Sequence, residues 1–175
     1  MADIQSNKRN ALTFMLFSIY LLALTWLILF KLQFSISVMR EGRVLNLIPL
    51  LGSIDNGAVR FTEIINNILA FIPLGIYICM LKSKWPFVKK VLAITVLSLA
   101  YETAQFIFVI GRADITDVLS NTLGGVIGIS VYVLASKLLK GKTNWVINIV
   151  ALILTVIVVL FVTVLVVNHR WVRIQ

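Results

Sequence analysis

Five apolar segments, each long enough to cross a lipid bilayer as a helix, alternate with polar connections along the chain. They span residues 11–30, 64–81, 91–110, 118–136 and 145–167. A hydrocarbon core of about 30 Å needs roughly 20 helical residues, and helices are expected because the bilayer offers no water to an open backbone. The pattern predicts an all-α, polytopic membrane bundle of about five transmembrane helices, with residues 1–175 as a single domain.

The connection between the first two segments, residues 31–63, is the longest in the chain. Its apolar run VLNLIPLLGSI is unsuited to a simple turn, so we expect an interfacial or re-entrant amphipathic segment here. The first apolar segment follows Lys8 and Arg9, as the apolar part of a signal peptide does. It is too long for that part, however, and no convincing small-residue cleavage site follows it. We interpret it as a retained first span.

Composition agrees with a membrane protein. Of the 175 residues, 60% are apolar and 13% are charged, against about 45–50% and 25% in soluble domains. The net charge of +9 comes from Lys and Arg in the connections, which favours orientation signals and contacts with anionic lipid over nucleic-acid binding. Basic residues are denser in the short loops on the side of the N-terminus, which predicts a cytoplasmic N-terminus.

Polar residues in and between the third and fourth segments are the main candidates for function. Six fall within 20 positions: Glu102, Gln105, Arg112, Asp114, Asp117 and Asn121. An ionisable group at membrane depth costs about 2.5–3.5 kcal/mol on insertion scales, so such residues indicate a function. Ser98, Glu102 and Gln105 share one helical face, and spacings of three and four connect Asp114 through Asp117 and Asn121. We predict two polar stripes that meet near the outer face of the membrane.

Some of these residues also have a purely structural interpretation. Glu102 could form an ion pair with Arg112 or Arg60 that only joins two helices. Asp114 could be no more than the N-cap of a helix, where an acidic side chain also gains from the helix dipole. These alternatives stay open at the level of the sequence.

The small and amide residues around the polar stripes point mainly to helix packing. Gly124 and Gly128 form the GxxxG pattern by which membrane helices pack closely, and we expect them to bring the neighbouring polar residues toward the helix of Glu102. In the second segment, Glu63 and Asn67 share a face and Pro73 predicts a kink. Asn67 is a candidate for a hydrogen bond across the bundle or for a ligand contact.

Three chemistries could use such a cluster. Glu102 and Asp117 could act as general acid and base on a lipid-linked sugar. Several carboxylates could hold a hard cation, or the whole set could bind a polar headgroup or peptide. The sequence has no zinc-ligand spacing, Gly-rich phosphate loop or nucleophile elbow, and its single cysteine and single histidine build no site. No cofactor and no metal site are therefore predicted.

Together these residues resemble the VanZ-like family, which is named for a teicoplanin-resistance protein. The resemblance covers roughly residues 40–135 and rests on Asn46–Pro49, Asn67, Phe71–Gly75, Ser98, Glu102, Gln105, Gly111–Arg112, Asp114, Asp117, Asn121–Gly125 and Gly128. Leu50 stands where the family segment is expected to carry Phe. The resemblance implies a small multi-pass protein of the bacterial cytoplasmic membrane. By analogy it implies lowered susceptibility to glycopeptides of the teicoplanin and lipoglycopeptide type, without supplying a mechanism.

The expected function is to bind an amphiphilic ligand at the outer leaflet, such as a lipid headgroup, a lipid-linked cell-wall precursor or a lipoglycopeptide. The predicted ligand-binding residues are Glu102, Gln105, Arg112, Asp114, Asp117, Asn121, Asn67 and Arg60. The alternative is an intramembrane enzyme that uses Glu102 and Asp117 as its acid and base. Transport is a weaker interpretation, because five spans without an inverted repeat would require a homo-oligomer.

Overall fold

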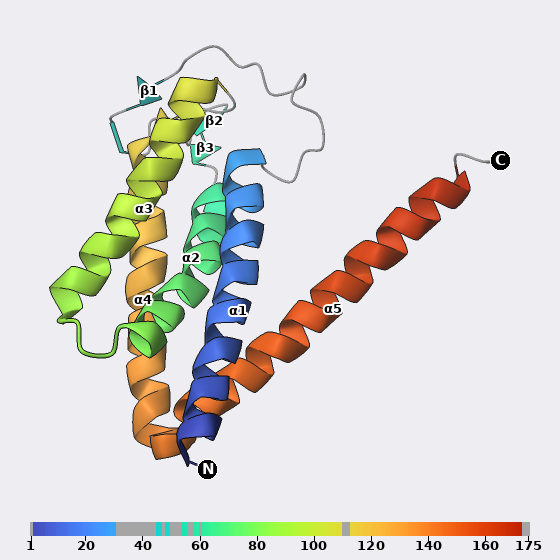
Figure 1. The fold of residues 1–175 in the computed structure, drawn as a ribbon. Helices are drawn as coiled ribbons and strands as arrows, with labels where there is room; N and C mark the ends of the chain where they lie inside the picture. Colours follow the sequence, from blue (N-terminus) through green and yellow to red (C-terminus); the bar gives the residue numbers. More distant parts are fainter. Residues whose placement is uncertain are drawn as a thin grey trace.

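A computed structural model describes the backbone of residues 2–30, 45–46, 48–49, 54–55, 58–59, 61–109 and 113–172. Within these residues the chain is almost entirely helical, as the apolar pattern predicts. The helices are α1 (Ala2–Phe30), α2 (Phe61–Leu81), α3 (Phe87–Phe108), α4 (Ile115–Leu139) and α5 (Thr143–Val172), with the 3-10 turn η3 (Lys140–Lys142) before α5. The two-residue strands β1 (Leu45–Asn46), β2 (Ile54–Asp55), β3 (Ala58–Val59) and β4 (Ala113–Asp114) lie at one end of the bundle (Figure 1).

Helices α1 to α4 form the bundle, whereas α5 leaves it at an angle after η3 (Figure 1). The most extensive helix contact is between α2 and α4. Glycine makes this contact possible, because a Cβ atom on Gly124 would overlap the carbonyl oxygen of Ile68 and one on Gly128 would overlap that of Ile72. The glycine pair was expected to bring the neighbouring polar residues toward the helix of Glu102, which is α3, but the glycines themselves pack against α2. The spacing defines a helix face but not the neighbour that it meets.

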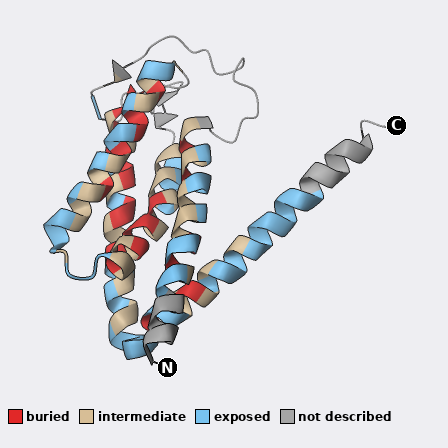
Figure 2. Cartoon of the chain, viewed as in Figure 1, coloured by how far each residue is buried: buried red, intermediate tan, exposed pale blue. Residues whose placement is uncertain are grey.

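Buried residues lie where the four helices face one another (Figure 2), and many large hydrophobic side chains are exposed on the outward faces. Phe71 and Ile94 are fully buried in this interior, and Leu24 packs in the same cluster. Large hydrophobic side chains such as Leu22 and Leu134 are exposed on the outside. An apolar outer surface of this extent suits contact with lipid acyl chains rather than with water. The chain is therefore a multi-pass membrane protein.

Four segments in the described part of the chain are long and apolar enough to cross a membrane. They are Asn10–Leu29, Phe61–Leu81, Phe87–Phe108 and Ile115–Val164. The last has 50 residues and contains α4, η3 and most of α5. About five spans were expected, and the described residues contain four candidate segments, of which the fourth includes two helices.

The long connection before α2 is described only in short pieces. Strands β2 and β3 pair antiparallel within it, and β1 pairs in parallel with β4. The rest of residues 31–60 lies outside the described residues, so the interfacial or re-entrant segment stays a prediction. The β1–β4 pairing sets Asn46 opposite Asp114, directly before α4. It joins this connection to the end of the bundle where α3 stops and α4 starts.

Candidate functional site

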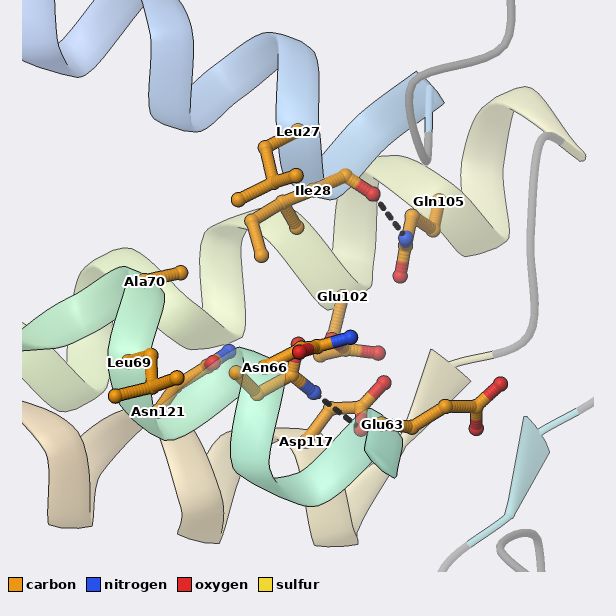
Figure 3. A pocket seen from close by; sticks show the side chains of 11 residues that line it. Leu27, Ile28, Glu63, Asn66, Leu69, Ala70, Glu102, Gln105, Asp117 and Asn121 are labelled. Carbon is orange, nitrogen blue, oxygen red and sulfur yellow. Dashed lines mark hydrogen bonds between the residues drawn. The ribbon is translucent and has the colours of Figure 1, made fainter. Parts of the chain in front are cut away.

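A cavity of about 580 Å³ opens at the end of the bundle where α1 and α3 finish and where α2 and α4 begin (Figure 3). All four helices contribute to its wall. Its lining divides into acidic, amide and apolar side chains: Glu63, Glu102 and Asp117; Asn66, Asn67, Gln105 and Asn121; and Leu27, Ile28, Leu69 and Ala70. Five of the eight predicted ligand-binding residues are in this list. The cavity is therefore the candidate site.

Helix α3 supplies Glu102 and Gln105 from its last turns, and both side chains are buried. The Glu102 carboxylate accepts a hydrogen bond from the backbone N–H of Asp114 at 2.9 Å (Oε2 to N). The Gln105 amide donates from Nε2 to the backbone carbonyl of Ile28 at 2.9 Å. Each side chain is thus held by the backbone of a different element. This fixes its orientation relative to the cavity.

Asp114 is the N-cap of α4, which confirms the structural interpretation of this residue. Its φ of −128° and ψ of 126° are extended, and its Oδ1 accepts from the backbone N–H of Thr116 at 2.8 Å. Its Oδ2 accepts from Nδ2 of Asn46 at 3.1 Å. Asp114 does not line the large cavity but a smaller one, of about 180 Å³, which Glu102 lines as well. Both carboxylate oxygens of Asp114 therefore accept hydrogen bonds from other residues of the chain.

Asp117 and Asn67 join α4 to α2 at the cavity wall. Asn67 donates from Nδ2 to Oδ1 of Asp117 at 2.7 Å (Figure 3). Both side chains are partly exposed, in contrast to the buried Glu102. Asp117 was expected to point toward the helix of Glu102. It lines the same cavity as Glu102, and its hydrogen bond with Asn67 joins it to α2. The two carboxyl groups proposed as acid and base thus reach the cavity from different walls.

Asn121 lies deeper in the cavity and is fully buried. Its Nδ2 donates to Oγ of Ser98 at 2.9 Å, so the polar stripes of α3 and α4 do meet at this level. The nearby Gly125 packs against the side chain of Ile94 on α3, with an added Cβ at 2.6 Å from Cδ1. Helix α4 therefore contacts α3 through Gly125 and α2 through the glycines on either side.

Two predicted binding residues, Arg60 and Arg112, lie outside the described residues. The proposed pairing of Glu102 with either arginine therefore stays a prediction. Within the part of the chain that the structure describes, no group of three or more His, Cys, Asp or Glu side chains could hold a metal ion.

Sequence reasoning missed several members of the lining. Asn66 and Glu63 neighbour Asn67, and their spacing on the first turns of α2 was the available signal. Leu27 and Ile28 could not be found, because nothing distinguishes two apolar residues near the end of a transmembrane helix from their neighbours. Asn46, which lines the smaller cavity, belongs to the Asn46–Pro49 segment noted in the sequence, but its contact with Asp114 depends on the β1–β4 pairing.

Comparison with known proteins places this geometry in a family. A sequence model described as VanZ/LLP1 matches residues 17–136. The chain is also 40% identical to Protein VanZ of Enterococcus faecium over 157 residues, which cover 88% of this chain and 94% of the relative. The chain belongs to the VanZ/LLP1 family. No solved structure matches it.

The VanZ/LLP1 match contains the whole candidate site. Every lining residue, from Leu27 in α1 to Asn121 in α4, lies between residues 17 and 136. Helix α5 starts at Thr143, beyond the matched region. The cavity is therefore a feature of the VanZ/LLP1 domain itself, and α5 contributes none of the lining residues.

Proposed function

We propose that this protein binds an amphiphilic ligand in the bacterial cell envelope and thereby lowers susceptibility to teicoplanin-type glycopeptides. The observation that carries the proposal is the cavity at the end of the bundle, which has a polar wall and an apolar wall. Candidate ligands are a lipid headgroup, a lipid-linked cell-wall precursor or a lipoglycopeptide. The link to glycopeptides rests on family membership, and the link to an amphiphile rests on the cavity.

The cavity has the size and the lining of a small-molecule site. Ligand pockets commonly enclose about 300–1,000 Å³, and this one encloses about 580 Å³. Leu69 and Ala70 of α2 and Leu27 and Ile28 of α1 supply an apolar surface, which suits an acyl chain. The carboxyl and amide groups of α3 and α4 suit a polar head. A ligand with both parts can occupy both walls at once.

The same end of the bundle is proposed to face the outside of the cell. The opposite end carries the lysine-containing turns, including Lys140 and Lys142 of η3. Beside the turn between α2 and α3, the ammonium groups of Lys82 and of Lys89 in the first turn of α3 lie 5.5 and 4.8 Å from the centre of the Trp85 ring. Trp is enriched at membrane interfaces, and Lys in short loops favours the cytoplasmic side. These features support the proposal of a cytoplasmic N-terminus and a cavity at the outer leaflet.

The fourth apolar segment is proposed to cross the membrane twice. A continuous helix of 50 residues would be about 75 Å long at 1.5 Å per residue, more than twice the thickness of a hydrocarbon core. Helix α4 instead ends at η3, and α5 departs in a new direction (Figure 1). Two crossings bring the total to five and leave the C-terminus outside.

Filling the cavity tests the proposed function. Ala70→Phe adds a ring to the apolar wall, whereas Ala100→Phe makes the same change on α3 at an exposed position outside the lining. Wild type and both variants are expressed at matched membrane levels in a susceptible bacterium, and the minimum inhibitory concentration of teicoplanin is measured. We expect Ala70→Phe to behave like cells without the protein and Ala100→Phe to behave like wild type. Equal protection by wild type and Ala70→Phe would refute a role for the cavity.

An acid–base enzyme is the second candidate, because Glu102 and Asp117 both line the cavity. Such an enzyme would convert a lipid-linked envelope substrate, and Glu102→Gln would abolish turnover while the substrate still binds. Protection that survives in Glu102→Gln and in Asp117→Asn would count against catalysis.

A further inference from the structure

The cavity wall is rich in hydrogen-bond acceptors, and three of its four amide side chains donate to other groups of the chain. Asn67 donates to Asp117, Gln105 donates to the carbonyl of Ile28, and Asn121 donates to Oγ of Ser98. Two amide oxygens, Oε1 of Gln105 and Oδ1 of Asn121, are buried without a hydrogen-bond partner. Buried polar atoms in proteins are nearly always paired. These oxygens therefore indicate a donor that occupies the cavity.

The orientation of the Gln105 amide follows from its partner. A backbone carbonyl can only accept, so the nitrogen of the amide must face Ile28 and the oxygen must take the other side. Gln105 is 2% exposed and lines the cavity. Its oxygen points into the space between α1 and Glu102 (Figure 3). An unpartnered acceptor is thus aimed at the ligand space from a side chain that cannot turn without losing its other bond.

Charge adds a second, independent preference. The chain carries a net charge of +9 and only seven acidic residues, yet three of them, Glu63, Glu102 and Asp117, line this one cavity. None of the described residues that line it is Lys, Arg or His. A ligand that is anionic at this wall would meet carboxylates and unpaired carbonyls together. A cation with N–H donors would satisfy both.

We propose that the cavity binds a protonated primary amine carried on an apolar chain, with the ammonium group at Glu102, Gln105 and Asp117. The proposal rests on the proposed function, because it specifies the head of the amphiphile bound there. A primary ammonium has three donors and no acceptor, which matches the carboxylates and the two unpaired amide oxygens of the wall. A bare metal ion would leave most of the 580 Å³ and the apolar wall unused.

The test compares four probes that share a twelve-carbon chain. The full-length protein is placed in phosphatidylcholine nanodiscs, and binding is measured by calorimetry with empty nanodiscs as the blank. Dodecylamine is protonated at pH 7, as a lysine side chain is. Dodecyltrimethylammonium keeps the charge without the donors, dodecanol keeps a donor without the charge, and dodecyl phosphate reverses the charge. We expect dodecylamine to bind at least about tenfold more tightly than the other three, as the loss of a charge-assisted hydrogen bond predicts.

Variants assign the preference to the cavity. Asp117→Asn should weaken the binding of dodecylamine by about tenfold and leave the affinity for dodecanol unchanged. Glu63→Gln, at a partly exposed position of the wall, provides a second test if Asp117→Asn does not fold. Asp3→Asn makes the same change of charge at the far end of α1 and should behave like wild type.

The outcomes separate this inference from the proposed function. If all four probes bind equally and Ala70→Phe abolishes binding of each, the cavity binds amphiphiles and the amine preference is refuted. If no probe binds, both proposals fail. Dodecyl phosphate that binds as tightly as dodecylamine, or dodecylamine displaced by submillimolar Mg²⁺, would overturn the assignment to an amine.

Discussion

Gly124 controls how closely α4 approaches α2, and Gly124→Val is the sharpest test of that packing. A Cβ at this position would overlap the carbonyl oxygen of Ile68 and lie 2.9 Å from both its carbonyl carbon and its Cα. These are backbone atoms, so they cannot rotate away as a flexible side chain could. Helix α2 would have to move as a unit, and Asn67 is the residue next to Ile68.

The size of the effect follows from these distances. Carbon atoms in contact prefer about 3.5–4.0 Å, so the 2.9 Å contacts must open by at least about 0.6 Å. The γ carbons of valine add to this, and overpacking of this kind costs about 1–3 kcal/mol. The better helix propensity of valine over glycine offsets only a few tenths of a kcal/mol. We expect a net loss of about 2 kcal/mol of unfolding free energy.

The assay is unfolding in mixed micelles with increasing sodium dodecyl sulfate, followed by circular dichroism. The control is Gly141→Val, because a Cβ on Gly141 meets no atom within 4 Å, and its free energy of unfolding should change by less than about 0.5 kcal/mol. If Gly124→Val unfolds at the same detergent fraction as the control, then α2 and α4 are not in the close contact described. A shift of α2 should also break the Asn67–Asp117 hydrogen bond, so Gly124→Val should lose dodecylamine binding as well.

Two further predictions concern the α4 cap and the orientation of the chain. Asp114→Ala should lower the free energy of unfolding by about 1–2 kcal/mol, because the backbone N–H of Thr116 loses its acceptor. Asp114→Asn should lower the free energy of unfolding much less. Equal effects of the two substitutions in the same detergent titration would contradict the capping role. In a Cys79→Ser background, an impermeant thiol reagent added to intact cells should label Thr62→Cys at the start of α2 but not Lys84→Cys in the following turn, and the reverse pattern would invert the proposed orientation.

Helix positions and helix faces follow largely from the sequence of this protein. The spacing of Ser98, Glu102 and Gln105 correctly predicted one polar face on α3, because a helix repeats every 3.6 residues. The same reasoning failed to predict which helix meets Gly124. A face can be derived from spacing within one segment, whereas its neighbour depends on how all the helices pack. The spacing of residues within one segment contains no information about how the helices pack.

The contribution of α1 to the cavity could not be predicted from the sequence, for a related reason. Ile28 contributes its backbone carbonyl, which accepts a hydrogen bond from Gln105. The pattern of side chains along the sequence gives no information about the position of a backbone group. Asp114 shows the opposite problem. Its side chain is conspicuous in the sequence, but its oxygens are used by Thr116 and Asn46. A polar residue within an apolar segment thus indicates that its side chain has a role. The sequence does not show whether that role is a hydrogen bond to the backbone or a contact with a ligand.

Glu102 is the residue where these two roles meet. It lines both the large and the small cavity, and its carboxylate accepts the backbone N–H of Asp114 directly before α4. A substitution at Glu102 would therefore disturb the junction of α3, β4 and α4 as well as any ligand. Asp117 lies in the first turn of α4, and its side chain accepts a hydrogen bond from Asn67 on α2. A loss of binding in Asp117→Asn or in Glu102→Gln can therefore arise from the ligand contact or from the helix contact, and a measurement of the free energy of unfolding separates the two causes.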